Sequence, residues 1–196
     1  MEVTPFPNLR VERHTIPPHA RIPNSPATGG KPLLIYRSAF GPASAVTAPA
    51  VEAHLRAVGV VEPSWRYGMF GEVHFHSTTH EVLVVVRGRA RLEFGGEGNP
   101  GGVEAVVGRG DVVVVPAGVG HRLVQEEEGD GEKFEMVGSY PVGAKRWDMC
   151  YGREGEEGRV DGIRGLGWFG GDPVYGGGGG GTCVGGLRGR SRDGRT

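Results

Sequence analysis

Between residues 81 and 115 the chain holds four short apolar segments with only glycine-containing turns between them. They are rich in valine and leucine and cover residues 81–86, 89–94, 103–107 and 111–115. Segments this closely spaced leave no room for connecting helices, so neighbouring strands must run antiparallel. The block predicts an all-β fold, an antiparallel sandwich or barrel. The runs VLVVV and VVVV are apolar at every position, which indicates that one face lines the interior and the other lies under an arm, a helix or a second subunit.

A pair of histidines precedes this block. His74 and His76 are two residues apart, so on an extended segment their side chains point to the same face. Glu81 follows, and His121 ends the later run GDVVVVPAGVGH. Three imidazoles and a carboxylate are a mixed nitrogen and oxygen ligand set that suits a divalent first-row metal ion. These four residues are therefore the candidate metal ligands.

His80 competes with Glu81 for a place in this site. Strict alternation from His76 turns His80 inward and Glu81 outward. Glu81 reaches the metal only if the chain turns or bulges between Ser77 and Thr79. On alternation alone, His80 remains an alternative ligand.

The spacing of these residues resembles the two motifs of the cupin family. The first motif matches at Gly68, His74, His76, Glu81 and Gly88, and the second at Gly110, Pro116, Gly118 and His121. Gln125 stands where the second motif ends in an asparagine that is not a ligand in the family. The phrase HSTTHEVL, with RWDMCYG and DPVYG further on, is similar to a smaller group of bacterial and fungal cupins.

The resemblance implies a jelly-roll sandwich or barrel with the metal held inside by three histidines and Glu81. It makes His80 a pocket residue beside the ligands, and we place Gln125 there as well. Three aromatic residues precede the first histidine pair, and we expect them to line the pocket because their segment delivers the ligands: Trp65, Tyr67 and Phe70.

Three histidines and one carboxylate leave one or two positions of a five- or six-coordinate ion open to water or substrate. An open position is typical of a catalytic metal. Iron, manganese, nickel, copper and zinc all accept such ligands, so the spacing does not identify the ion. The expected function is a metal-dependent enzyme on a small molecule, similar to cupin dioxygenases or isomerases. The alternative is a non-catalytic cupin that binds a metal or small ligand as a sensor or store.

The rest of the chain indicates one domain over residues 1–175 and a flexible tail over 176–196. Residues 1–32 are rich in proline and form an arm. A short helix should begin at Thr47 or Ala48, near Pro49, and end at Gly59, because Val51, Leu55 and Val58 recur at helical spacing. The tail holds six consecutive glycines and several arginines, which offer little to bury.

Composition excludes several classes of partner. A net charge of −1 indicates neither nucleic acid nor an anionic membrane surface. No apolar run is long enough to cross a bilayer, and the first residues lack the features of a signal peptide, so the sequence predicts a cytoplasmic protein. The two cysteines, Cys150 and Cys183, are expected to be reduced. Strands that are apolar on both faces, together with a single motif pair, favour a homodimer.

Overall fold

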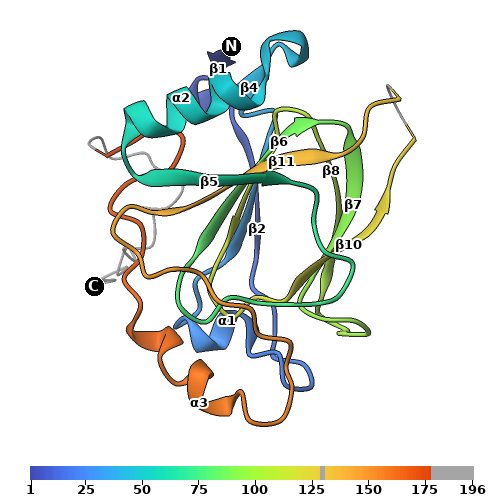
Figure 1. Ribbon diagram of the computed structural model, residues 1–196, viewed down its shortest axis with the longest axis vertical. Helices are drawn as coiled ribbons and strands as arrows, with labels where there is room; N and C mark the ends of the chain where they lie inside the picture. Colours follow the sequence, from blue (N-terminus) through green and yellow to red (C-terminus); the bar gives the residue numbers. More distant parts are fainter. Residues whose placement is uncertain (129–130, 178–196) are drawn as a thin grey trace, which may run out of the picture.

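The computed structural model describes residues 1–128 and 131–177, which form an antiparallel β-sandwich (Figure 1). A six-stranded sheet has the order β2 (Arg10–His14), β3 (Leu33–Arg37), β9 (Val112–Val115), β6 (Glu81–Arg87), β11 (Glu135–Pro141), β5 (Val61–Tyr67). A three-stranded sheet has the order β10 (His121–Glu126), β7 (Arg89–Phe94), β8 (Val103–Gly108), and a small third sheet pairs β1 (Glu2–Val3) with β4 (Phe40–Gly41). The all-β fold predicted from the sequence is confirmed.

The core of the sandwich lies between the two larger sheets. Leu83 and Val85 of β6 are fully buried there and pack in one cluster with Leu92 and Phe94 of β7. Side chains alternate along a strand, so every second residue of β6 faces this core, beginning with Glu81 at its first position. The apolar cluster thus fixes which face of the sheet the carboxylate of Glu81 occupies.

The outer face of the six-stranded sheet is covered by helix α2 (Ala48–Val58). Val82 and Val84 of β6 are buried on this face in one cluster with Val51 and Leu55 of the helix. Figure 1 shows α2 at one end of the sandwich and the short helices α1 and α3 at the other. The helix therefore buries part of the outer face of strands that are apolar on both faces.

Helix α2 begins and ends at the predicted residues. The side-chain oxygen of Thr47 accepts a hydrogen bond from the backbone N–H of Ala50, which satisfies one of the free donors of the first turn. Gly59 follows the last turn with a φ of 72°, the left-handed conformation that glycine adopts at little cost.

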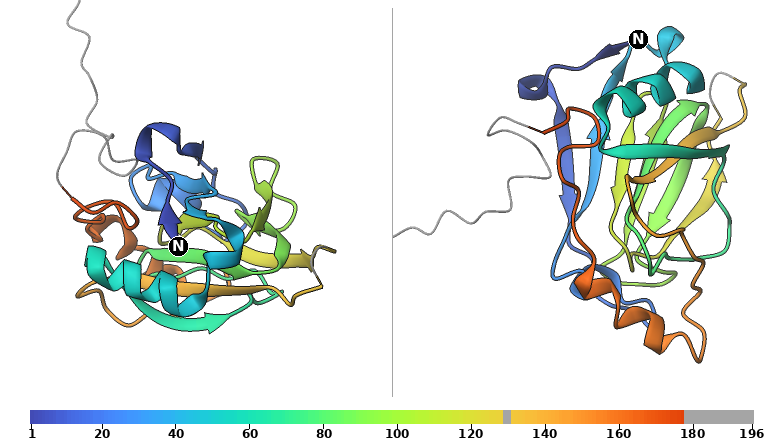
Figure 2. Two further views of the ribbon diagram at one scale, coloured as in Figure 1. Left: turned by 90° about the horizontal axis from the view of Figure 1, so that it is seen from above. Right: turned by 60° about the vertical axis from the view of Figure 1, so that its left-hand side comes forward.

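The segment after β11 adds to the cover of the outer face. It contains α3 (Glu157–Val160) and a 3₁₀ turn, η3 (Ile163–Gly165), and it then runs beside β2 and β3 (Figure 2). Phe169 and Val174 join the outer cluster. This part of the outer face is thus covered from within the chain.

The N-terminal arm is more regular than its sequence indicated. It contributes β2, whose Val11 pairs with Tyr36 of β3, and it holds a 3₁₀ turn, η1 (Phe6–Asn8), and helix α1 (Asn24–Ala27). A second 3₁₀ turn, η2 (Ala43–Ala45), precedes α2. The sequence of the arm shows no strand periodicity, yet part of the arm forms a strand because β3 offers an open edge with which it can pair.

The predicted tail over residues 176–196 lies outside the described residues apart from Gly176 and Gly177. Cys183 lies outside them as well, and Cys150 is a buried free thiol. Within the described part of the chain, no helix has the length and apolar character needed to span a membrane.

Candidate metal centre

Three backbone arrangements bring the predicted ligands together. His74 and His121 form an isolated antiparallel bridge, in which each backbone N–H donates to the carbonyl of the other, at 3.2 and 2.8 Å. His76 is two residues beyond His74, and Glu81 opens β6 on its core-facing side. Residues from a loop and two strands of different sheets thus converge at one end of the core.

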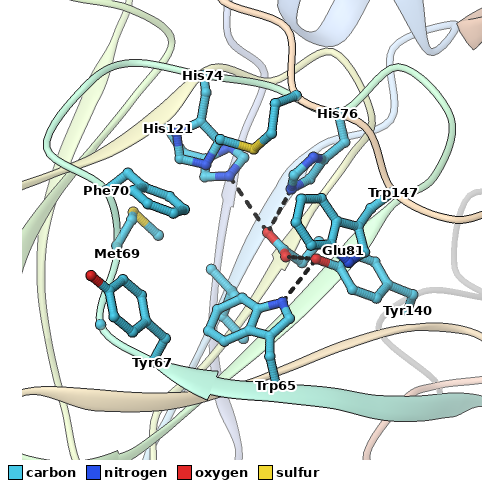
Figure 3. A pocket seen from close by; sticks show the side chains of 13 residues that line it. Trp65, Tyr67, Met69, Phe70, His74, His76, Glu81, His121, Tyr140 and Trp147 are labelled. Atoms are coloured by element: carbon cyan, nitrogen blue, oxygen red, sulfur yellow. Dashed lines mark hydrogen bonds and ion pairs between the residues drawn. The ribbon is translucent and has the colours of Figure 1, made fainter.

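The four side chains converge on a common point (Figure 3). Ligand atoms of His74, His76 and His121 lie within 4.8 Å of one another. Oε2 of Glu81 is 3.5 Å from Nε2 of both His76 and His121. All four residues are buried, with at most 5% of their surface accessible to solvent. Ligand atoms about 2.1 Å from one ion stand roughly 3 to 4 Å apart, so a first-row metal ion fits these donors with small shifts.

The three imidazoles are oriented by hydrogen bonds to backbone carbonyls. Nδ1 of His74 lies 3.0 Å from the carbonyl oxygen of Glu72, and Nδ1 of His121 lies 2.9 Å from that of Val119. Nδ1 of His76 bonds to the carbonyl of Asp148.

A carbonyl oxygen only accepts, so each Nδ1 must carry a proton and donate it. In a neutral imidazole the other nitrogen then keeps its lone pair. The backbone therefore holds all three histidines in the tautomer whose Nε2 can serve as a metal ligand, as it usually does for metal-binding histidines.

Burial and mutual proximity set the charges of the site. Burial lowers the pKa of His74, and burial with the neighbouring His74 and His76 lowers that of His121 to about 3. Burial alone would raise the pKa of Glu81, but the imidazoles of His76 and His121 and the hydroxyl of Tyr140 hold it well below its usual range. Burial also opposes the charge of His76, yet the nearby Glu81 carboxylate raises its pKa. The site presents an ionised carboxylate and neutral imidazoles at His74 and His121.

A bend after His76 decides between Glu81 and His80. The chain bends at Ser77 and Thr78, which breaks the alternation and turns Glu81 toward the histidines. Asp148 holds this bend: Oδ1 accepts from the backbone N–H of Ser77 at 2.7 Å, and Oδ2 accepts from its hydroxyl at 2.6 Å. Thr78 donates to Oδ1 as well. We call Asp148 with Ser77 and Thr78 the latch.

His80 faces the other side of the sheet. Its Nδ1 accepts from the backbone N–H of Ala117 at 2.9 Å, and its Nε2 donates to the carbonyl of Gly167 at 3.1 Å. The ring packs against Trp168 and Phe169, and burial lowers its pKa to about 4. Both nitrogens are therefore engaged away from the candidate centre, and His80 ties the C-terminal segment to the sheet.

A cavity of about 210 Å³ leads from the candidate ligands toward the surface. Trp65, Tyr67 and Phe70 line it, as the sequence indicated, and the last two are about half exposed. Gln125 does not lie there. It sits on the exposed part of β10, where its amide donates to Glu127. Strict alternation from His121 would keep Gln125 on the inner face, but the register shifts between Leu123 and Gln125, and this bulge turns it outward.

Further lining residues were not identified from the sequence, among them Tyr140, Trp147 and Met149. The hydroxyl of Tyr140 donates to Oε1 of Glu81 at 2.7 Å and accepts from Nε1 of Trp65 at 2.9 Å (Figure 3). Trp147 and Met149 flank Asp148, so the segment that forms the latch also walls the cavity. In the sequence RWDMC, the apolar residues Trp147 and Met149 alternate with the polar Asp148. Only the fold shows that the apolar residues line the cavity while Asp148 contacts Ser77 and Thr78.

The N-terminal arm supports the loop before His121. Asn24 of α1 is fully buried; its side-chain amide donates to the carbonyl of Gly95 at 2.9 Å, and its side-chain oxygen accepts from the N–H of Gly120 at 3.1 Å. Its backbone N–H donates to Gly118. The arm thus fixes the turn that delivers a candidate ligand.

Comparisons with known proteins place this arrangement in a family. The family model described as Cupin matches residues 38–139, just over half of the chain. The uncharacterized protein YjlB of Bacillus subtilis (strain 168) is 34% identical over 159 residues, which are 74% of this chain and 81% of that protein.

Solved structures with lower similarity include a mutant of Bacillus subtilis oxalate decarboxylase OxdC, at 18% identity and a TM-score of 0.36, and vicilin from Capsicum annuum, at 17% identity and a TM-score of 0.35. Each match covers 61% of this chain but only 27% and 30% of the respective solved chain. Because the family model matches more than half of the chain, the assignment is clear: the chain belongs to the cupin family.

Proposed function

We propose that this cupin is a metal-dependent enzyme that acts on a small molecule, with one divalent transition metal ion held by His74, His76, His121 and Glu81. The observation that carries the proposal is the convergence of three oriented Nε2 atoms and one carboxylate oxygen at the inner end of a cavity that reaches the surface. A purely structural site has no need of access, whereas a catalytic site keeps a position open to substrate.

An ion bound at this site, whether iron, manganese, nickel, copper or zinc, would supply a Lewis acid with open positions for substrate, and with iron also for dioxygen. Dioxygenase-like and isomerase-like reactions are the two classes that this chemistry supports best. The choice between them depends on which ion the protein takes up.

The residues of the chain hold and insulate the site. Tyr140 fixes one oxygen of Glu81, which leaves the other facing the histidines. Burial and the nearby Glu81 carboxylate raise the pKa of the Tyr140 hydroxyl, so this group stays protonated and remains a donor. The cavity walls are apolar side chains, which exclude water and strengthen electrostatic interactions near the ligands.

One observation favours the alternative, a non-catalytic cupin that only holds a metal or a small ligand. Among the lining residues that the structure describes, the side-chain donors nearest the candidate ligands are already committed, since Trp65 donates to Tyr140 and Tyr140 to Glu81. A site that only stores or senses its ligand needs no uncommitted acid or base.

Metal analysis followed by an activity screen separates these possibilities. Protein purified without added metal should contain close to one transition metal ion per chain, and alanine at His74, His76 or His121 should lower that content sharply while the fold is retained. Oxygen consumption and isomerisation over a panel of small molecules should then reveal turnover. If all three variants keep full metal content, the proposed centre is wrong; metal without turnover favours the non-catalytic alternative.

The homodimer and the cytoplasmic location stay predictions. The dimer was expected because strands apolar on both faces need cover, and part of that cover comes from α2 and from Phe169 and Val174 of the same chain. Light scattering that gives a mass near 20.7 kDa at all concentrations would exclude the dimer.

A further inference from the structure

The cavity beside the candidate centre has an uneven distribution of polar groups. Among the described residues that line it there is no lysine, arginine, asparagine or glutamine. Apart from the phenol of the exposed Tyr67, its ionisable groups gather at the inner end, at the three histidines and Glu81, with Tyr140 beside them. A ligand with a second charged group, such as an aliphatic dicarboxylate, would place that charge against Leu83, Met149 or Trp147 without a partner, which burial strongly disfavours.

Two neutral polar groups of the inner wall, those of Trp65 and Tyr140, are also committed. Nε1 of Trp65 donates to Tyr140, and the hydroxyl of Tyr140 donates to Glu81. A ligand that carried hydroxyl or amide groups along its length would give up hydrogen bonds to water here and gain none from these two side chains. The body of a suitable ligand is therefore apolar, with its polar atoms at one end.

Two pairs of aromatic side chains flank the cavity, as Figure 3 shows. On one side the rings of Tyr67 and Phe70 lie 5.6 Å apart, and the edge of Phe70 meets His74 at the same distance. On the other side Tyr140 and Trp147 are stacked, with centroids 6.3 Å apart and 20° between their planes. Such walls favour a flat aromatic ring, which can stack or meet them edge to face.

The volume sets the size of that ring system. An apolar cavity of about 150 Å³ holds one benzene molecule. The cavity of about 210 Å³ therefore has room for one substituted ring or two fused rings.

We propose that the cavity takes a compact, flat aromatic compound with a single oxygen donor of phenol or enol type, turned toward the three histidines and Glu81. The orientation of the oxygen rests on the proposed metal-dependent function. The binding of the ring does not, because the aromatic walls are formed by the chain itself.

The tryptophans of the chain offer a direct test. Of its three tryptophans, Trp65 and Trp147 line the cavity, whereas Trp168 packs against His80 outside it. Their indole N–H groups give separate NMR signals, which Trp168→Phe assigns in part. The probes are 2-naphthol and, as a matched contrast, succinate, each titrated into chelator-treated and zinc-loaded protein.

With 2-naphthol we expect saturable shifts of the Trp65 and Trp147 signals in both forms of the protein, with the Trp168 signal unmoved. Succinate should leave all three unmoved in the chelator-treated form. Phe70→Ser should weaken 2-naphthol binding roughly three- to tenfold in the chelator-treated protein. The control is Val142→Ser, which alters an exposed apolar side chain that does not line the cavity and should have no effect on 2-naphthol binding.

The outcomes distinguish the two proposals. No saturable shift with 2-naphthol, or equal shifts with succinate in the chelator-treated protein, would overturn the aromatic ligand. Shifts with 2-naphthol in a protein that fails to bind zinc would uphold the aromatic cavity and remove the metal-dependent function.

Discussion

The hydroxyl of Tyr140 donates to Oε1 of Glu81 at 2.7 Å, and this leaves Oε2 of the same carboxylate 3.5 Å from Nε2 of His76 and of His121. One oxygen is held by the protein and the other faces the position of the proposed ion. The carboxylate is thus oriented before any ion binds, which is how residues around metal ligands raise affinity.

Replacing Tyr140 with phenylalanine should weaken metal binding by roughly tenfold and lower the free energy of unfolding by about 1 to 3 kcal/mol, because a buried carboxylate oxygen loses its donor. Zinc affinity measured by competition with a chelator, together with urea unfolding, checks both effects. Tyr67→Phe is the matched control, since Tyr67 lines the same cavity but is 57% exposed, so loss of its hydroxyl leaves no buried group without a partner. Equal effects of the two substitutions would contradict the role given to Tyr140.

Glu81→Gln and His80→Gln form a second pair of variants. Glutamine keeps the shape of Glu81 but removes its charge, so metal affinity should fall by roughly tenfold or more. His80→Gln should leave metal affinity within about threefold of the unmodified protein, because both nitrogens of His80 bond to backbone groups away from the centre. A large loss for the His80 variant with none for the Glu81 variant would make His80 the ligand.

The latch predicts a third outcome. Asp148→Ala removes the acceptor for Ser77 and Thr78 and loosens the segment whose carbonyl orients His76. Metal affinity should fall roughly tenfold. Trypsin should also cut faster after Lys145 or Arg146, since both are exposed and lie beside the released segment.

Glu154→Ala is the control for the latch, because it removes another acidic side chain that is exposed on the same C-terminal segment. Cleavage rates measured by mass spectrometry for the two variants decide the matter. If the Asp148 variant is cut no faster than the Glu154 variant, Asp148 does not hold the segment in place.

The buried His80 predicts how stability depends on pH. Burial lowers its pKa from 6.5 to about 4, so between these values the unfolded chain binds a proton that the folded chain does not. The contribution of His80 to the free energy of unfolding is therefore fully present above pH 6.5 and is lost as the pH falls toward 4. The loss from this one residue amounts to roughly 3 kcal/mol.

His80→Gln isolates that contribution. In chelator-treated protein, the difference in unfolding free energy between the unmodified chain and this variant should shrink by about 2 to 3 kcal/mol from pH 7 to pH 4.5. Urea unfolding at the two pH values measures it. A difference that is the same at both values would show that His80 is not buried in its neutral form.

The closely spaced apolar segments and the motif spacing were enough to predict the sandwich and to name all four residues that converge. Those signals are local: alternation, turn glycines and fixed intervals between histidines. The side on which Glu81 lies is not a local property. It depends on a bend at Ser77 and Thr78 that is held by Asp148 from a segment some seventy residues away. Periodicity along one strand carries no information about such a contact.

Contacts between distant segments also explain why Tyr140, Trp147 and the strand in the N-terminal arm were not predicted from the sequence. Tyr140 and Trp147 read as ordinary residues of a strand and a loop, and only the pairing of β11 with β5 and β6 brings Tyr140 beside Trp65 and Glu81. The arm lacked a strand pattern because β2 is an edge strand with partly exposed side chains, so its pairing with β3 rather than its own sequence orders it.

The indole of Trp65 lies directly over Gly138 of β11, so close that a Cβ at this glycine would stand 2.0 Å from the ring. Trp65 can form this part of the cavity wall because Gly138 of β11 has no side chain. A methyl group at position 138 would displace the indole of Trp65, break its hydrogen bond to Tyr140 and change the shape of the cavity. In an engineering programme or a survey of natural variants, substitutions at position 138 would therefore change the size of the cavity without altering any of the four candidate ligands.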